Sequence, residues 1–163
     1  MDPGQQQLNL KKQSGADGDL LVLEGVLDEN AEPKFKELHK ELANKIVIDL
    51  GGVWRINSVG VMLWLAFMRS LGTRKVAFRR CHPVIVEQLN TVMDFRGMAK
   101  IESILAPYFC SSCNREQNEE LVIGRDVSPT NLSQFPARKC SQCHSAMQFD
   151  DIPDRYLGFL AYV

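Results

Sequence analysis

The sequence predicts an α/β fold in which a mixed or mostly parallel β-sheet carries packed helices. Two observations predict this fold. Short apolar runs typical of strands alternate along the chain with longer segments in which apolar residues recur at helical spacing. The connections between these segments are short, as expected when successive elements pack beside one another. The composition suits a folded chain, because 45% of its 163 residues are hydrophobic and 24% are charged.

The strands are predicted from short runs rich in leucine, valine and isoleucine. The run 45–50, KIVIDL, is continuous and β-branched, which is typical of a strand buried on both faces. The run 75–80 alternates in polarity, as a strand with one polar face does. The predicted strands are 19–27, 45–50, 75–80 and 100–105, with a weaker one around 8–13.

Three helices are predicted between these strands. The first covers 30–45, with Asn30 as its cap and apolar residues along one face. The second follows directly on Ser58. The third opens with Pro83, because proline is tolerated in a first helical turn, and ends near Gly97.

The second helix begins at the junction Asn57-Ser58, and both residue types are good N-caps. In the simplest interpretation, the Ser58 hydroxyl accepts a hydrogen bond from an early backbone N–H of the helix. A phosphate on this serine is also favoured, because a helix N-terminus offers free N–H groups and the positive end of the dipole. Phosphoserine would add about −1.5 to −2 charges at one surface position, enough to block or create a partner interface.

The run after Ser58, 59–68, is apolar nearly all round the helix. Such a helix either lies inside the core or has an outer face covered by something else. The residues predicted to face the core are Met62, Leu65 and Ala66. Trp64 and Phe67 then fall on another face, which we expect to be covered by the C-terminal segment or by a partner.

Four of the five cysteines form two pairs, Cys110-Ser-Ser-Cys113 and Cys140-Ser-Gln-Cys143, with 26 residues between them. Two residues between thiolates let both reach one ion from a tight turn, and two such turns supply four sulfurs in a tetrahedron. We predict a zinc site here, with iron as the main competitor. Four thiolates close the coordination shell, so the metal is expected to be structural. Short strands predicted at 119–123 and 146–149 would support it, as in a zinc ribbon.

A CxxC pair by itself is also typical of a thiol–disulfide oxidoreductase, here through Cys110 and Cys113. The doubled pattern favours metal over this alternative. Cys81 has no paired cysteine nearby in sequence and is interpreted as a small buried hydrophobic residue. His144 follows Cys143 and is interpreted as a turn residue or a group behind the ligands, since four thiolates need no fifth ligand.

The region 8–105 resembles the STAS domain of sulfate transporters and anti-sigma factor antagonists. The resemblance rests on EGVLD at 24–28, the helix after it, IVIDLGGV at 46–53 and the turn Asn57-Ser58-Val59-Gly60, which lie in the family's order and spacing. It implies a STAS-like mixed sheet with packed helices and a regulatory function through a protein partner.

The resemblance also implies a role for the turn. In the bacterial anti-sigma factor antagonists, the serine matching Ser58 is phosphorylated by a partner kinase that is also the anti-sigma factor, and phosphorylation releases that partner. This chain departs from the pattern, with Asn57 where the regulated members usually have aspartate and Val59 in place of a small polar residue. We expect Ser58, with Asn57 and Gly60, to form a phosphoacceptor and partner-docking site.

Three parts are predicted along the chain: a STAS-like domain at 1–106, a zinc-ribbon insertion at 107–149 and a closing helix at 150–163. The one long stretch with loop composition, 124–139, lies inside the insertion. The closing helix, capped by Asp150 or Asp151, is expected to dock back across the STAS-like domain.

The function expected from these features is protein docking, and the sequence offers little for an enzyme. It contains no Ser-His-Asp set, no phosphate-binding glycine loop and no clustered carboxylates. A net charge of −1 disfavours nucleic acid as a ligand, and acidic residues lie among the few arginines near the cysteines. The sequence lacks a signal peptide and a run long enough to cross a membrane, so a cytoplasmic protein is expected. Pairing of two copies stays open.

Overall fold

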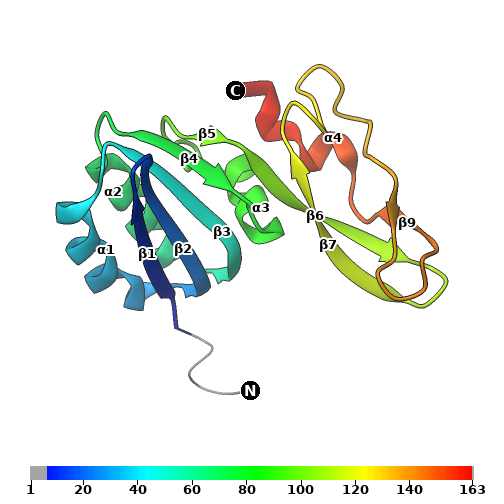
Figure 1. Ribbon diagram of the computed structural model, residues 1–163, viewed down its shortest axis with the longest axis horizontal. Helices are drawn as coiled ribbons and strands as arrows, with labels where there is room; N and C mark the ends of the chain where they lie inside the picture. The colour runs from blue at the N-terminus through cyan, green and yellow to red at the C-terminus, as the bar shows by residue number, and fades with distance from the viewer. Residues whose placement is uncertain (1–6, 163) are drawn as a thin grey trace.

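The computed structural model describes residues 7–162. A five-stranded sheet has helices behind it, and a second, four-stranded sheet extends to one side (Figure 1). Residues 1–6 of the predicted STAS-like domain and residue 163 of the predicted closing helix lie outside the described residues. The predicted α/β class, a mixed sheet with packed helices, is confirmed.

The first sheet has the strand order β1-β2-β3-β4-β5. Its strands are β1 (Asn9–Gly15), β2 (Gly18–Leu27), β3 (Lys45–Ile56), β4 (Lys75–Arg79) and β5 (Lys100–Ile101). The β1–β2 pair is antiparallel, and the other neighbours are parallel. Parallel neighbours need crossover connections, and helices supply them, as the alternation in the sequence predicts.

The helices of this part are α1 (Glu32–Leu38), α2 (Ser58–Ser70) and α3 (Pro83–Thr91), with 3-10 turns η2 (Glu29–Ala31) and η3 (His39–Glu41) on either side of α1. The first helical segment is capped by Asp28 instead of Asn30, because the Asp28 carboxylate accepts a hydrogen bond from the Asn30 N–H at 3.0 Å. The third helix ends short of Gly97. The chain is extended at Val92 and takes a left-handed conformation at Asp94, with φ of 62°, which stops the helix.

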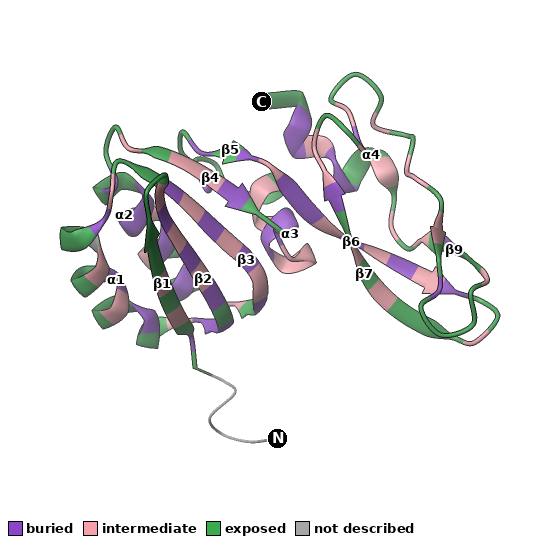
Figure 2. Ribbon diagram, viewed as in Figure 1, coloured by how far each residue is buried: buried purple, intermediate pink, exposed green. Residues whose placement is uncertain are grey.

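The helices cover only one face of the five-stranded sheet. On β3, Ile46, Ile48 and Leu50 are buried beneath them, whereas Val47 and Asp49 on the other face stay partly exposed. The alternation along the strands is visible in Figure 2. We call the uncovered side the open face. On it, Leu20 of β2 and Ala77 of β4 lie opposite Val47, and Val22 of β2 lies opposite Asp49.

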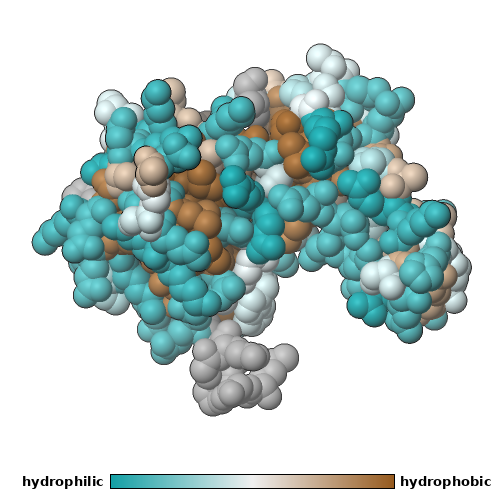
Figure 3. Space-filling view, in the orientation of Figure 1, coloured by the Kyte–Doolittle hydropathy of each residue, from teal (hydrophilic) through white to brown (hydrophobic). Residues whose placement is uncertain are grey.

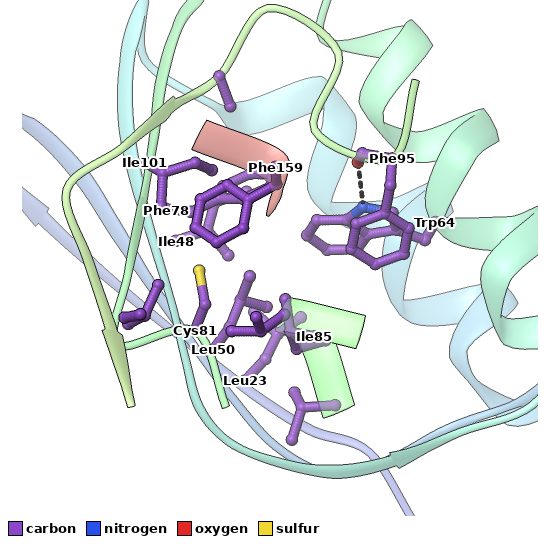
Figure 4. Packing of buried hydrophobic residues seen from close by; sticks show 14 of the residues in the cluster. Leu23, Ile48, Leu50, Trp64, Phe78, Cys81, Ile85, Phe95, Ile101 and Phe159 are labelled. Atoms are coloured by element: carbon purple, nitrogen blue, oxygen red, sulfur yellow. Dashed lines mark hydrogen bonds between the residues drawn. The ribbon is translucent and has the colours of Figure 1, made fainter. Parts of the chain in front are cut away.

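The helix α2 packs with the face opposite to the predicted one. Trp64 and Phe67 are buried, and the Trp64 indole N–H donates to the carbonyl oxygen of Phe95 at 2.8 Å (Figure 4). The residues wrongly predicted to face the core, all at least partly exposed, are Met62, Leu65 and Ala66. The reason is Gly60. A Cβ there would collide with the Leu27 carbonyl, so glycine lets the first helical turn lie directly on β2 and thereby fixes the rotation of the helix.

The second sheet has the order β7-β6-β9-β8. Its strands are β6 (Ser103–Cys110), β7 (Arg115–Val122), β8 (Arg138–Lys139) and β9 (Ala146–Phe149). The predicted strand 100–105 is therefore divided at Glu102 between the two sheets. Backbone hydrogen bonds from Cys81 to Ser103 and from Leu105 to Cys81 still tie the start of β6 to the end of β4. One hydrophobic core consequently runs through both sheets.

The chain ends in two short turns, α4 (Pro153–Tyr156) and η4 (Gly158–Tyr162), in place of the predicted continuous helix. No side chain caps α4; the Asp151 carboxylate instead pairs with Arg155 at 2.6 Å. The segment docks against α3, as predicted, because the Asn90 side chain donates to the Tyr156 carbonyl at 3.0 Å and accepts from the Phe159 N–H at 2.7 Å.

Among residues 7–162, no helix combines the length and the apolar character that crossing a membrane requires.

Candidate metal centre and docking surface

Two hairpin turns bring the four paired cysteines together. Cys110 ends β6 and Cys113 lies in the turn before β7, whereas Cys140 and Cys143 lie in the turn between β8 and β9. Pairing of β6 with β9 places the two turns near each other. All four sulfur atoms lie within 4.8 Å of one another, so the predicted convergence is confirmed. We call this group the four-cysteine cluster.

The distances between the sulfurs fit a tetrahedral metal site. The Sγ–Sγ distance is 3.4 Å for Cys110 and Cys143 and 3.6 Å for Cys113 and Cys140. Four sulfurs bonded at about 2.3 Å to one zinc ion would lie about 3.8 Å apart. Both short distances also join one turn to the other, which a shared ion requires and a disulfide inside one CxxC pair does not. The donor set therefore fits a closed shell around zinc, or around iron.

Hydrogen bonds prepare part of the four-cysteine cluster for an ion. Bonds from Ser145 lower the pKa of the Cys143 thiol to about 6. Backbone N–H groups of Cys143 and Gln142 lower the pKa of Cys140, whereas desolvation raises the pKa of Cys113 to about 12. Metals bind the thiolate form, so the lowered pKa values of Cys140 and Cys143 favour binding of an ion, whereas Cys113 must release a proton when the ion binds.

Each CxxC turn closes with a residue in the left-handed region of backbone space. Asn114 has φ of 56° and His144 has φ of 59°. The His144 N–H donates to the Cys140 carbonyl at 3.0 Å, and the Gln142 N–H lies 3.4 Å from the Cys140 sulfur. The backbone of His144 thus shapes the turn, in agreement with its interpretation as a turn residue.

Aromatic side chains hold the long loop and the C-terminal segment against the second sheet. The Tyr108 hydroxyl donates to the Pro136 carbonyl at 2.8 Å. The rings of Phe135 and Phe149 stack with their centroids 3.7 Å apart, and Tyr156 meets Phe149 edge-on at 5.4 Å. The turns that carry the cysteines therefore rest on a packed base.

Cys81 lies apart from this chemistry. It is fully buried in the core, burial raises the pKa of its thiol, and it is not a member of the four-cysteine cluster. Its interpretation as a small buried hydrophobic residue therefore agrees with the structure. The Cys110/Cys113 pair lies in a hairpin turn and lacks the helix N-terminus that lowers thiol pKa values in many redox CxxC sites.

The second candidate site is the start of α2. Asn57, and not Ser58, caps the helix, because the side-chain oxygen of Asn57 accepts a hydrogen bond from the Gly60 N–H at 2.8 Å. The predicted capping role of Ser58 is therefore wrong. Ser58 is the first helical residue, its side chain is exposed, and its hydroxyl makes no hydrogen bond within the described part of the chain. Gly60 is buried and serves the packing of α2 on β2.

Glu29 also belongs to this site, although no pattern in the sequence points to it. The Asn57 amide donates to the Glu29 carboxylate at 3.1 Å, and this bond helps to lower the pKa of Glu29 after the larger effect of its own backbone N–H. The two residues lie 28 positions apart, so no local pattern reveals the pair. A carboxylate therefore lies next to the cap of α2 although position 57 itself carries an amide.

Apolar side chains surround the free hydroxyl. Val59 is 44% exposed and Met62 is 69% exposed. One turn further, a groove of about 490 Å³ opens between α1 and α2, with Leu63 and Ala66 of α2 in its lining. The start of α2 thus combines a modifiable hydroxyl with an apolar surface.

No protein-family model and no curated protein matches the sequence. Among solved structures, the chain is similar to an anti-sigma factor antagonist from Mycobacterium paratuberculosis, with a TM-score of 0.46 and 19% sequence identity. The similarity covers 58% of this chain and 86% of that chain.

Proposed function

We propose that this chain is a bacterial regulatory module that docks a protein partner, in the manner of anti-sigma factor antagonists. The docking surface consists of Ser58, Val59 and Met62 together with the groove between α1 and α2. Phosphorylation of Ser58 switches it. The chain is not an enzyme, and a structural Zn²⁺ in the four-cysteine cluster holds the second sheet.

The observation that carries this proposal is the surroundings of the Ser58 hydroxyl. It is exposed and free of hydrogen bonds within residues 7–162, so a kinase can reach it without unfolding the helix. Exposed apolar side chains, Val59 and Met62, lie beside it on α2. Such a combination suits a surface that buries apolar area in the unmodified state and loses the partner when a charge is added.

The switch has a physical basis in the charges nearby. A phosphate on Ser58 would be stabilised by the N-terminus of α2 and would add to the negative charge of Glu29. Both charges would need to be desolvated when a partner covers Met62, and an unpaired buried charge is costly. Phosphorylation is therefore expected to release a partner that contacts this apolar surface.

The four-cysteine cluster has a supporting role in this function. A closed shell of four thiolates leaves no open position for a substrate. Metal binding contributes on the order of 10 kcal/mol to the folding of small modules, and the second sheet has short strands that need such support. The metal would keep the second sheet rigid beside the docking module.

The test is affinity capture from the native host with the full chain, followed by reconstitution with the purified candidate partner. Ser58→Ala is expected to retain the partner, whereas Ser58→Asp and Met62→Glu lose it. Met93→Glu is the matched control, because Met93 is 86% exposed in the loop after α3. A partner that binds all four variants equally would show that the start of α2 is not the docking surface.

A second candidate function, thiol–disulfide exchange, rests on the lowered pKa of Cys143 and the exposure of its side chain. It predicts that the reduced chain attacks a disulfide substrate through the Cys143 thiolate and that Cys143→Ser abolishes this reaction. The pair expected from the sequence, Cys110 and Cys113, suits the reaction less, because desolvation raises the pKa of Cys113 to about 12. The docking proposal predicts that all four thiols of the metal-loaded protein resist alkylation and that no such reduction occurs.

A further inference from the structure

The open face of the first sheet carries a row of lysines at one end. Each of the neighbouring parallel strands β3, β4 and β5 begins with a lysine, namely Lys45, Lys75 and Lys100. All three lysines are exposed. Each is followed by a residue that points to the helices, so the lysine itself points to the open face. In the sheet register, Lys45 lies directly opposite Lys75, and Lys100 lies opposite Ala77. Neighbouring strands are about 4.8 Å apart and Lys100 lies two residues further along than Lys75, so the three lysines span roughly 12 Å of the sheet.

These lysines differ from three other cations of the same sheet and its edge. Each of those three forms an ion pair with a carboxylate. The nitrogen–oxygen distances are 3.4 Å for Lys11–Glu24, 3.3 Å for Arg79–Glu102 and 3.0 Å for Arg80–Asp49. Within residues 7–162, the row Lys45, Lys75 and Lys100 makes no ion pair. Like charges directly opposite each other on neighbouring strands destabilise a sheet. An anionic partner would remove this repulsion.

Next to the lysines lies an apolar strip. Leu20, Val47 and Ala77 form one cross-strand row, and Val22 continues it along β2. Each is only partly buried, although the neighbouring residues on the helix-covered face, such as Ile46 and Phe78, are fully buried. Figure 3 shows hydrophobic residues among hydrophilic ones over this sheet. The strip crosses three strands and is therefore about 10 Å wide, close to the diameter of an α-helix.

We propose that the open face binds an amphipathic helix of a partner protein, with its apolar side on Leu20, Val47 and Ala77 and with acidic residues against Lys45, Lys75 and Lys100. Strands β2 to β5 of this sheet are parallel, and parallel strands usually have helices on both faces. The uncovered face of this sheet lacks that layer within the described residues. The strip itself is aliphatic, and Trp54, an exposed aromatic residue of β3, lies near the other end of that strand, so a protein segment fits the strip better than a nucleic-acid base.

This surface is separate from the one at Ser58. Lys45 begins β3, whereas Ser58 follows the end of β3, so the two lie roughly 35 Å apart along the strand. They also lie on opposite faces of the sheet. The two proposals can consequently fail independently, because Ser58→Asp and Met62→Glu leave the open face intact.

The test uses the full metal-loaded chain and a synthetic helical peptide of about 18 residues, with leucine on one face and glutamate on the other. Binding is measured by fluorescence anisotropy at low and high salt. Replacing Lys45, Lys75 and Lys100 together by serine is expected to weaken binding by about tenfold or more, because each exposed pair contributes modestly. The matched control replaces Lys34, Lys40 and Lys139, which carry the same total charge elsewhere. It is expected to leave the affinity within about twofold of the wild type.

Further probes decide the class of partner. The same peptide with lysine in place of glutamate is expected not to bind, and amide NMR shifts with the acidic peptide should map to β2, β3 and β4. An equal loss of peptide binding in the two triple variants would overturn the proposal. So would preferential binding of phosphatidylserine vesicles or single-stranded DNA that depends on the same lysines, because the partner would then be a membrane or a nucleic acid.

Discussion

The side chain of Asn57 connects two segments of the chain with its two polar atoms. Its carbonyl oxygen accepts a hydrogen bond from the Gly60 N–H at 2.8 Å, and its amide donates to the Glu29 carboxylate at 3.1 Å. An aspartate at this position could accept the first bond but could not donate the second. The amide therefore lets Glu29 supply the carboxylate beside the start of α2.

We expect Asn57→Asp to destabilise the chain near neutral pH although aspartate is itself a good N-cap. The new carboxylate would lie against Glu29, and repulsion between the two raises the pKa of each. Groups whose pKa is raised in the folded state disfavour folding when they are ionised. The loss is therefore expected above about pH 5 and should shrink as the pH falls through about 4. Urea unfolding across this range measures it.

Two further variants separate the cap from the charge. Asn57→Ala removes both bonds and is expected to cost about 1 kcal/mol of unfolding free energy near neutral pH. The cost should be smaller at a pH low enough to protonate Glu29, because the bond from Asn57 helps to lower the pKa of that carboxylate. The double variant Asn57→Asp with Glu29→Gln restores a donor–acceptor pair and is expected to regain the stability lost in Asn57→Asp. If the double variant is no more stable than Asn57→Asp, the contact between the two side chains has no energetic weight.

Gly60 is expected to be intolerant of even one methyl group. A Cβ at this position would collide with the backbone of Leu27, and neither backbone can move without shifting α2 on the sheet. Gly60→Ala is therefore expected to lower the unfolding free energy by about 1–3 kcal/mol, despite the better helix propensity of alanine. Val59→Ala, at an exposed position of the same turn, is the control and should change it by less than about 0.5 kcal/mol. Equal stability of the two variants would contradict the close packing.

The sequence was sufficient for the order of strands and helices, because local periodicity predicts them, and for the convergence of the four cysteines, because two CxxC pairs together are typical of one metal site. It was insufficient for the rotation of α2. With apolar residues nearly all round the helix, periodicity does not favour one face, and the contact of Gly60 with Leu27 decides which residues are buried.

Two other features could not be predicted from the sequence, because they depend on how segments of the chain are arranged in the fold. The lysines that begin β3, β4 and β5 are ordinary one by one, and only the parallel register brings Lys45 opposite Lys75. Ser58 looked as good a cap as Asn57, and only the backbone conformation decides between neighbours. Asn57 is extended, with φ of −108° and ψ of 175°, which is the geometry of an N-cap.

Metal affinity is expected to fall more steeply once the pH drops below about 6, the pKa of the Cys143 thiol, because a second thiol then binds a proton in addition to Cys113. Protons and the ion compete for the thiolate, so acid weakens binding and alkali strengthens it. Ser145→Ala removes the main hydrogen bond that lowers this pKa, and the steeper fall should then begin at higher pH. Competition with a chromophoric zinc chelator over a pH series measures both curves.

Cys81→Ala provides the control for this experiment, because Cys81 is buried outside the four-cysteine cluster. It should bind one ion per chain with an unchanged pH profile, whereas Cys143→Ser should lose stoichiometric metal. If the slope of affinity against pH does not change near pH 6 in the wild type, the Cys143 thiol does not take part in binding.

His144→Gly is expected to preserve metal binding and to stabilise the metal-bound chain slightly. His144 has φ of 59°, a conformation that glycine adopts without the penalty that a Cβ brings, so the gain is about 0.5–1 kcal/mol. His144→Val should cost a similar amount or more, because a β-branched residue is the poorest choice for this region. Chelator competition and thermal unfolding of the zinc-loaded protein measure the two effects, with Asn114→Gly as the matched change in the other turn. If instead the His144 imidazole holds the ion, glycine and valine will both reduce affinity to a similar extent, and Asn114→Gly will not.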